Sequence, residues 1–387
     1  MNFDKNKEYG LVLEGGGAKG SYQIGAWKAL RELGINIKGV VGTSVGALNG
    51  AMIVQDEFDE ALKLWSEIDP SKVLNIDNDM RELIRFPMKI DEIKKLRVKM
   101  KKFIGIDGID ITPLKNLIRD TIDEEKIRNS KMDYGLVTVS LSDMKSIQIF
   151  KGEIEEGLLC DFLLASSYLP VFKREKLHGK TYIDGGFYDK TPVSMLIDKG
   201  YKDIIVVRLH GIGIDKRYTV PEEVNIITID PKDDLGGILD FSNERALLNI
   251  NIGYYDTIRL FNDLKGKYFY INTDKDEDFF IKKLLNLDYQ TTQDLINSFG
   301  LNDLPVKRNL FEIVFPRIAK KINLKNGWDY KELIIGIYEY YGKKINIDRF
   351  KIYDLKELIE KVSERIDEVE NNHYKSLNRL IKNFDMD

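Results

Sequence analysis

The sequence is poor in several features that mark particular classes of protein. Its single cysteine, Cys160, lies in an apolar helical run and is expected to pack in a core. One cysteine cannot form an intramolecular disulfide, which is typical of a reducing compartment. No apolar run reaches the roughly 18 residues of a membrane-spanning helix, and the opening MNFDKNKEYG lacks the apolar stretch of a secretory signal. We therefore expect a cytoplasmic protein, with peripheral contact to a membrane left open.

The charge balance argues against another class. The formal net charge is −4 over 387 residues, whereas a protein dedicated to nucleic acid normally carries a strong basic excess. No nucleic-acid partner is therefore predicted. Apolar residues make up 43% of the chain, which is enough for a full hydrophobic core, so extensive disorder is not expected.

Short runs rich in β-branched residues alternate with segments of helical periodicity. Strands are predicted at residues 9–14, 38–44, 134–141, 146–152, 181–186, 203–209 and 225–231. Helices are predicted at residues 22–33, 47–54, 58–68, 158–166, 192–199 and 243–262. This alternation is typical of a three-layer α/β fold, in which helices flank a central, mostly parallel sheet.

The strand signals mostly stop near residue 266. Helices are predicted beyond it at 279–289, 293–299, 331–342 and 353–384. In the last of these, the apolar residues from Leu355 to Val369 follow helical spacing. We therefore expect an α/β domain over residues 1–265 and a mainly helical C-terminal region over residues 266–387, whose role the sequence does not reveal.

Residues 85–103 stand apart by their charge. They read RFPMKIDEIKKLRVKMKKF, with eight Lys or Arg residues against two acidic ones. A solvated helix face accounts for most runs of this kind. The alternative is a basic amphipathic surface that contacts anionic lipid headgroups, and both interpretations stay open.

A glycine-rich turn separates the first predicted strand from the first predicted helix. A phosphate-binding loop needs Lys and then Ser or Thr directly after its last glycine, but here Lys19 precedes Gly20. A dinucleotide fingerprint fits Gly15, Gly17 and Gly20 but also needs an acidic residue about 20 positions on, and GINIKGVVGTSV offers none. The third interpretation is a loop whose bare amides bind the oxyanion of a reacting ester.

The second predicted strand ends in GTSVG, from Gly42 to Gly46, and a predicted helix follows. G-x-S-x-G at a strand-to-helix turn is the pattern of a nucleophile elbow, from which the Ser44 hydroxyl projects. In a parallel sheet both turns emerge at the same edge. The glycine-loop amides are therefore expected to face a carbonyl group that Ser44 attacks.

Ser44 needs a proton acceptor, and two kinds are available. The three histidines are His178, His210 and His373, of which His210 follows a predicted strand and fits the chain order Ser–acid–His. The other candidate is Asp184 in TYIDGGFYDK, an acid at a strand end that glycines allow to pack tightly against a partner. Burial would raise the pKa of such a carboxylate and make it a stronger base. The residues alone leave both candidates open.

Three motifs together carry a family resemblance. GGGAKG, GTSVGALNGA and DGG occur in the order in which they are found in the patatin-like phospholipase family. ASSYLPVF, residues 165–172, is also similar to a stretch that precedes the DGG motif there. The resemblance covers about residues 9–200 and continues more weakly through LDFSNERALLNINIGYYDTIRLF. One departure follows the DGG motif, where the family often has Asn before Pro and this chain has Lys190, Thr191 and Pro192.

The resemblance implies a lipid acyl hydrolase that uses a Ser–Asp dyad without histidine. Ser44 would be the nucleophile and Asp184 the base, acting on a lipid or phospholipid ester with no cofactor and no metal. A Ser–His–Asp esterase that uses His210, and a catalytically silent lipid-binding or regulatory protein, are the alternatives. The matching positions assign the oxyanion hole to Gly15, Gly16 and Gly17, and supporting roles to Lys19, Gly42, Gly46, Gly185 and Gly186. The headgroup, the acyl position, the chain length and the oligomeric state are not predicted.

Overall fold

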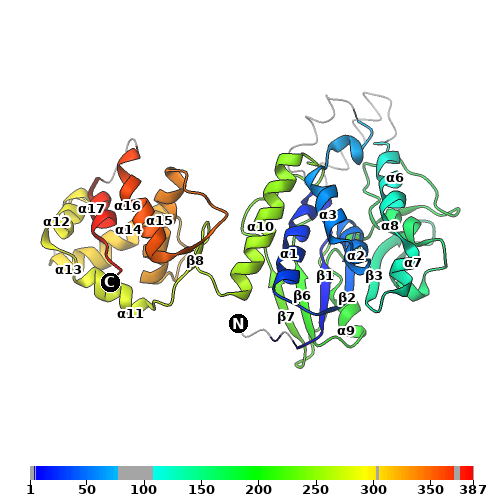
Figure 1. Cartoon of the computed structure of the whole chain (residues 1–387), viewed down its shortest axis with the longest axis horizontal. Coiled ribbons are helices and arrows are strands. Elements are labelled where there is room, and N and C mark those ends of the chain that lie inside the picture. The colour runs from blue at the N-terminus through cyan, green and yellow to red at the C-terminus, as the bar shows by residue number, and fades with distance from the viewer. Residues whose placement is uncertain (1–3, 5, 77–107, 302–304, 370–374, 387) are drawn as a thin grey trace. The chain divides into compact units, whose positions relative to one another are not determined.

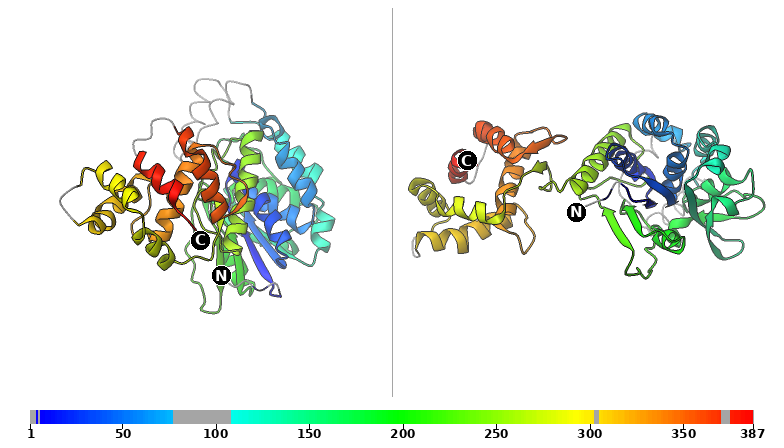
Figure 2. Two further views of the ribbon diagram at one scale, coloured as in Figure 1. Left: turned by 60° about the vertical axis from the view of Figure 1, so that its left-hand side comes forward. Right: turned by 60° about the horizontal axis from the view of Figure 1, so that its bottom comes forward.

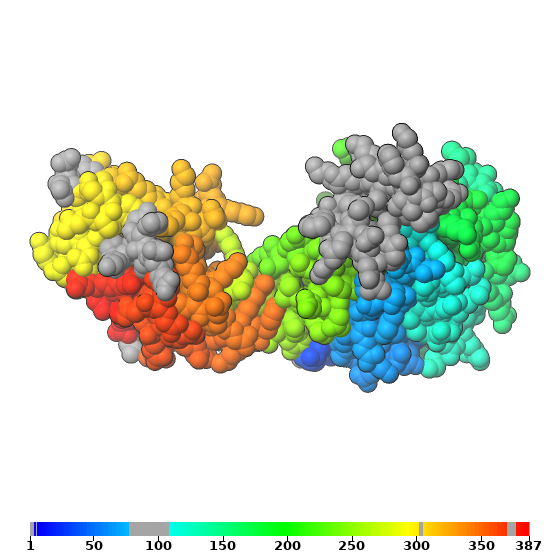
Figure 3. Space-filling model, turned by 90° about the horizontal axis from the view of Figure 1, so that it is seen from above, coloured from blue at the N-terminus to red at the C-terminus, as the bar shows by residue number. Residues whose placement is uncertain are grey.

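The computed structural model of the chain describes residues 4, 6–76, 108–301, 305–369 and 375–386. The basic segment 85–103 and His373 therefore lie outside the described residues. Contacts between Cα atoms divide the chain into two compact units, Asn2–Ile258 and Arg259–Asp387. Figures 1 and 2 show the helices and strands of each unit, and Figure 3 shows the chain as a space-filling view.

The first unit is built on one seven-stranded sheet. Its strand order is β4-β3-β2-β1-β6-β7, with β5 paired to β3 beside this path. The β3–β2, β2–β1, β1–β6 and β6–β7 pairs are parallel, whereas β4 and β5 run antiparallel to β3. All seven predicted strands are present: β1 Tyr9–Leu13, β2 Ile37–Thr43, β3 Asp133–Ser140, β4 Lys145–Phe150, β5 Tyr182–Asp184, β6 Asp203–Val207 and β7 Asn225–Ile229.

Helices cover this sheet on both faces, so the predicted fold class is confirmed (Figure 1). Neighbouring residues of a strand point to opposite faces. Val12 and Val41 accordingly pack against α9, whereas Leu13 and Val40 lie beneath Gly50 of α2. Helices α6 and α7 were not predicted. The helices of this unit are α1 Ser21–Glu32, α2 Val45–Val54, α3 Phe58–Ser66, α6 Thr112–Thr121, α7 Glu124–Asn129, α8 Leu159–Ser166, α9 Val193–Asp198 and α10 Asn243–Phe261, the last of which continues to the start of the second unit.

Strands β2 and β5 share one edge of β3 and meet there end to end. β4 occupies the other edge of β3 along its length, so both strands must lie on the remaining one. β2 runs parallel to β3 and ends with the pair Thr43–Val137, while β5 runs antiparallel and ends with the pair Asp184–Thr138. The carboxyl ends of the two strands therefore reach consecutive positions of β3. Strand pairing alone brings Ser44, which follows Thr43, close to Asp184.

The second unit is mainly helical and has its own hydrophobic core. Buried aromatic residues, among them Phe269, Phe280, Phe315 and Tyr338, lie at its centre. The helices are α11 Glu277–Leu285, α12 Tyr289–Ser298, α13 Val306–Asn309, a π-helical turn Leu310–Val314, α14 Phe315–Lys321, α15 Tyr330–Lys344, α16 Leu355–Arg365 and α17 Lys375–Asn383.

Three features of the second unit differ from the prediction. Helices α13 and α14 were not predicted. The helical stretch 353–384 is interrupted, because α16 ends at Arg365 in a 3₁₀ turn, Ile366–Glu368, before α17 begins. Two short strands, β8 Tyr270–Asn272 and β9 Ile352–Asp354, form a parallel pair that was not predicted. Three residues are too few to show an alternating apolar pattern, which explains why neither strand stood out in the sequence.

Candidate active site

Ser44 occupies a sharp turn between β2 and α2. Its backbone has φ 56° and ψ −127°, a conformation that is uncommon for residues other than glycine and is found most often at functional sites. The Ser44 carbonyl accepts hydrogen bonds from the amides of Ala47 and Leu48 at 2.9 and 3.2 Å, so α2 starts directly behind it. The serine therefore lies at a strand end and at a helix N-terminus, in the strand–turn–helix geometry of a nucleophile elbow.

Glycines on either side of Ser44 make this turn sterically possible. A Cβ atom at Gly42 would lie 2.3 Å from the carbonyl carbon of Gly46. A Cβ atom at Gly46 would lie 2.2 Å from the carbonyl oxygen of Leu13 in β1. Real Cβ atoms essentially never come this close to other atoms. A side chain at Gly42 would therefore force α2 away from β2, and one at Gly46 would force α2 away from β1.

Asp184 ends β5 with its carboxylate buried beside Ser44. The residue is 4% exposed. Oδ1 accepts a hydrogen bond from the Gly186 amide at 2.8 Å, and Oδ2 is buried without a partner among the described residues. Burial raises the pKa of Asp184 to about 6, while the Ser44 hydroxyl and the Gly186 amide act in the opposite direction. Ser44 is thus near enough to lower this pKa but does not complete a hydrogen bond to Oδ2, a contact that often tightens only when substrate binds.

Ser166 holds the backbone of the Ser44 turn, a role that the sequence did not reveal. Its Oγ accepts a hydrogen bond from the Ser44 amide at 2.8 Å and donates one to the Val137 carbonyl at 2.7 Å. Two residues later, the Tyr168 carbonyl accepts a hydrogen bond from the Asp184 amide at 2.9 Å. The end of α8 and the residues directly after it therefore bind the backbones of both Ser44 and Asp184. The only sequence signal was its place in ASSYLPVF.

Two of the three amides of the glycine loop are free to bind a ligand. The Gly15 amide donates a hydrogen bond to the Lys190 carbonyl at 2.9 Å. The amides of Gly16 and Gly17 have no acceptor in the part of the chain that the structure describes. Gly17 also lines the same pocket as Ser44. Any oxyanion hole built from this loop as it stands therefore rests on Gly16 and Gly17, because the Gly15 amide is already engaged.

Lys19 lies at the end of this loop and is only partly exposed. Its Nζ donates a hydrogen bond to the His210 carbonyl at 3.2 Å. Burial lowers the pKa of Lys19. The ammonium group therefore ties the glycine loop to the segment after β6, and adds positive charge near the turn.

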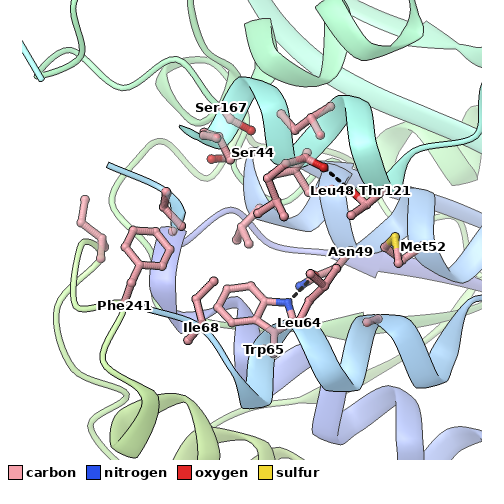
Figure 4. A pocket seen from close by; sticks show the side chains of 18 of the residues that line it. Ser44, Leu48, Asn49, Met52, Leu64, Trp65, Ile68, Thr121, Ser167 and Phe241 are labelled. Atoms are coloured by element: carbon pink, nitrogen blue, oxygen red, sulfur yellow. Dashed lines mark hydrogen bonds between the residues drawn. The ribbon is translucent and has the colours of Figure 1, made fainter. Parts of the chain in front are cut away.

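An apolar pocket opens beside Ser44 between α2, α3 and α6 (Figure 4). It encloses about 110 Å³. Each helix contributes residues spaced three or four positions apart, which places them on a single helix face. These residues are Leu48, Asn49 and Met52 of α2, Ala61, Leu64 and Trp65 of α3, and Leu114, Leu117, Ile118 and Thr121 of α6.

The few polar groups of the pocket are almost all engaged. Asn49 accepts a hydrogen bond from the Trp65 indole at 3.0 Å, and the Thr121 hydroxyl donates one to the Leu117 carbonyl at 2.7 Å. The Ser167 hydroxyl is buried and has no partner among the described residues. A ligand in this pocket would therefore meet an almost wholly apolar wall.

Comparisons with known proteins identify the segment that carries this site. A family model described as patatin-like phospholipase matches residues 11–197, which include Ser44, Asp184 and the glycine loop. Residues 11–197 belong to the patatin-like phospholipase family. The match ends one residue before the end of α9, so it takes in the meeting point of β2 and β5.

The curated relatives match this chain over only part of their own length. Lysophospholipase nte1 of Aspergillus terreus is 54% identical over 50 residues, which are 13% of this chain and 3% of that protein. An uncharacterized NTE family protein of Mycobacterium tuberculosis is 23% identical over 202 residues, or 52% of this chain and 49% of that one. Patatin-like phospholipase domain-containing protein 7 of Rattus norvegicus is 24% identical over 205 residues, covering 51% and 13%. The chain thus spans about half the length of these relatives or less.

Solved structures give a weaker similarity. VipD from Legionella pneumophila aligns with 96% of this chain and 86% of its own, at a TM-score of 0.40 and 14% sequence identity. The type III effector protein ExoU aligns at a TM-score of 0.35 and 14% identity, over 96% of this chain and 74% of its own. Similarity at this level supports no conclusion about function.

The other residues singled out in the sequence make no described contact with Ser44 or Asp184. The His210 imidazole is 56% exposed and pairs with Asp230 at 3.0 Å, and no described contact joins it to Ser44. His178 is similarly exposed and pairs with Asp161. Cys160 is half-buried in α8, and burial raises the pKa of its thiol, which disfavours the reactive thiolate.

The described residues contain neither a metal-binding cluster nor a membrane-spanning helix. No group of three or more histidine, cysteine or carboxylate residues in them is placed to bind a metal ion. Within the same residues, no helix combines the length and the apolar character required to cross a bilayer.

Proposed function

We propose that the patatin-like domain hydrolyses carboxylic esters of lipids through a dyad of Ser44 and Asp184. The observation that carries this proposal is the pairing of the two residues at the meeting point of β2 and β5. There the Ser44 hydroxyl lies beside a buried carboxylate that has a free oxygen and a pKa of about 6. A carboxylate with this pKa is largely ionised near neutral pH, and is a stronger base than an exposed Asp.

The acylation step uses the groups that surround this pair. Ser44 Oγ attacks the carbonyl carbon of the ester while its proton passes to Asp184 Oδ2. The carbonyl oxygen becomes negative and accepts hydrogen bonds from the free amides of Gly16 and Gly17. Fixed amides of this kind stabilise a tetrahedral oxyanion by roughly 3 kcal/mol for each donor.

The second half of the reaction restores both residues. The tetrahedral intermediate expels the alcohol, which takes the proton from Asp184 and leaves the acyl group on Ser44. Water then attacks this acyl-enzyme and gives its proton to Asp184. Expulsion of Ser44 Oγ, which recovers that proton, releases the fatty acid.

The apolar pocket supports a lipid as the substrate. A wall that offers almost no unpaired polar group favours the acyl chain over a polar group, because burial of an unpaired polar group is costly. Peripheral contact with an anionic membrane through residues 85–103 stays a prediction from the sequence, since the structure does not describe that segment.

Hydrolysis of a panel of lipids tests the proposal. The panel contains phospholipids, lysophospholipids and neutral glycerides, and released fatty acid is measured for the wild type, Ser44→Ala and His210→Ala. We expect turnover of at least one lipid class by the wild type and by His210→Ala, but none by Ser44→Ala. A fluorophosphonate probe should label the wild type and spare Ser44→Ala. Activity that survives Ser44→Ala, or is lost in His210→Ala alone, would refute the dyad, and absence of both labelling and turnover would favour a silent lipid-binding protein.

A further inference from the structure

The carboxylate of Glu14, directly before the glycine loop, lies at the centre of a buried polar network. Glu14 is fully buried. Its Oε1 accepts a hydrogen bond from the Gly211 amide at 3.1 Å and forms an ion pair with Lys190 Nζ, also at 3.1 Å. Its Oε2 accepts a hydrogen bond from the Leu209 amide at 2.7 Å and forms an ion pair with Arg208 Nε at 2.9 Å. Two backbone amides and two cations therefore surround one carboxylate, an arrangement found where a buried charge is held in a fixed position.

These donors belong to two loops beside the candidate site. Lys190 lies on the Asp184 loop, residues 184–191, and its carbonyl accepts the Gly15 amide hydrogen bond. Leu209 and Gly211 lie on the loop that follows β6, residues 208–215, to which Lys19 also donates. We call this last segment the bridging loop.

The bridging loop also contacts the Asp184 loop directly. The Ile214 amide donates a hydrogen bond to the Gly186 carbonyl at 2.8 Å, and the Lys190 amide donates one to the Ile214 carbonyl at 2.9 Å. Gly186 in turn holds Asp184 Oδ1. The ion pair of Glu14 with Lys190, followed by hydrogen bonds between Lys190, Ile214, Gly186 and Asp184, therefore links the Glu14 carboxylate to the carboxylate of Asp184.

The charges of this network balance. Lys190 Nζ contacts both Glu14 and Asp215, the latter at 3.3 Å. Arg208 also contacts both acids, reaching Asp215 at 3.1 Å. Two cations thus face two anions, and Glu14 is the fully buried member. Removal of its charge would leave Lys190, which is 8% exposed, with only the partly exposed Asp215 as a counter-ion.

We propose that Glu14 is a positioning residue, which fixes the glycine loop and the Asp184 loop relative to one another through Lys190 and the bridging loop. This inference rests on the proposed function, because it assigns Glu14 a task in the geometry of that reaction. Glu14 itself does not touch the substrate. Lys190, the departure from the family pattern noted in the sequence, supplies the matching cation. The pair sets the distance between the amides of Gly16 and Gly17 and the base that takes the proton.

The test compares Glu14→Gln, Lys190→Met and the double variant. Glu14→Gln keeps the shape but turns an amide nitrogen towards two hydrogen-bond donors, so the loops should shift. We expect kcat and the rate of fluorophosphonate labelling to fall by roughly 10²-fold, since small misplacements of catalytic groups cost about that much. KM should stay within about threefold of the wild type, because the apolar pocket is unchanged. Lys190→Met should also lower kcat and leave KM nearly unchanged, with a smaller loss of kcat, because Glu14 keeps Arg208 and both backbone amides as partners.

The double variant separates positioning from a purely structural role. Removal of both charges should return the melting temperature towards that of the wild type while kcat stays low. Glu339→Gln is the matched control, because Glu339 is a buried carboxylate of the second unit that accepts hydrogen bonds from three backbone amides. It should lower the melting temperature and leave kcat unchanged.

Three outcomes would overturn the inference. These are wild-type kcat in Glu14→Gln, recovery of kcat together with stability in the double variant, or an equal rise in KM and fall in kcat. If Glu14→Gln does not fold, the test rests on Lys190→Met alone. A wild-type kcat in that variant would then refute the positioning role of the Glu14–Lys190 pair. Wild-type protein that neither turns over lipid nor labels would instead refute the proposed function.

Discussion

Replacement of Asp184 by Asn should greatly reduce activity and at the same time stabilise the fold. Burial raises the pKa of Asp184 from 3.8 to about 6, a shift of roughly two units. At about 1.4 kcal/mol per pKa unit, the ionised carboxylate lowers the free energy of unfolding by about 3 kcal/mol at neutral pH. Asn has nearly the same shape and no charge to desolvate, so the substitution removes this cost.

The pH dependence of the gain follows from the direction of the shift. Between 3.8 and about 6 the folded state holds the Asp184 proton more tightly than the unfolded chain does. The wild type therefore loses stability as pH rises through this window, and the full loss persists above it. The gain from Asp184→Asn should be absent near pH 4 and complete near pH 8, where it corresponds to a rise in melting temperature of roughly 6–12 °C.

Calorimetry of the wild type and Asp184→Asn across this pH range measures the effect, and lipid turnover should fall by roughly 10²–10⁴-fold. Asp189→Asn is the matched control. It is another buried acid of the same loop, burial raises its pKa to about 6, and its Oδ2 also has no partner among the described residues. Asp189→Asn should gain stability in the same pH window, while lipid turnover by Ser44 is retained. A gain for Asp184→Asn that is absent, or equal at both ends of the range, would refute the argument from burial.

Three further outcomes are expected. Since Asp184 must be ionised to accept the proton, kcat/KM should fall about tenfold per unit as pH drops below about 6, and a rate that stays flat to pH 4 would contradict this. Ala61→Trp should fill the pocket and reduce turnover of long-chain esters by roughly tenfold or more. Turnover of the short ester p-nitrophenyl acetate should not change. Equal loss of activity on both substrates would contradict the proposal that the pocket binds the acyl chain. Ser166→Ala should destabilise the fold by roughly 1–3 kcal/mol and slow turnover, because it leaves the Ser44 amide unpaired. The neighbouring Ser167→Ala should raise the melting temperature slightly, because it removes an unpaired buried hydroxyl, and the reverse order of the two variants in thermal unfolding would contradict these assignments.

Much of the first unit could be predicted from its residue pattern. The strands that carry the site are short, rich in β-branched residues and bounded by glycines, so their positions and the fold class followed directly. The proximity of Ser44 and Asp184 depends on the antiparallel return of β5, which no local pattern encodes. It was expected only because the order of three motifs resembled a known family.

What the sequence did not reveal depends on contacts between distant residues. Glu14 is followed by glycines and has no periodic context, and its partners Lys190 and Arg208 are far along the chain. The Gly15 amide was predicted to bind an oxyanion together with its neighbours, but its hydrogen bond to Lys190 is visible only in three dimensions. The assignment of the hole to Gly16 and Gly17 stays a proposal.

The shared edge of β3 also bears on how this domain tolerates change in length. The chain leaves β3 after Ser140, forms β4 and α8, and returns so that Asp184 pairs with Thr138. The segment between β3 and β5 therefore begins and ends at neighbouring positions of the sheet, which fixes both of its ends. Insertions in its outer turns, such as the exposed one at Met144, should leave Asp184 in place, because the entropy of closing a longer loop grows only slowly with length. The site can therefore stay constant while the surface around it diversifies.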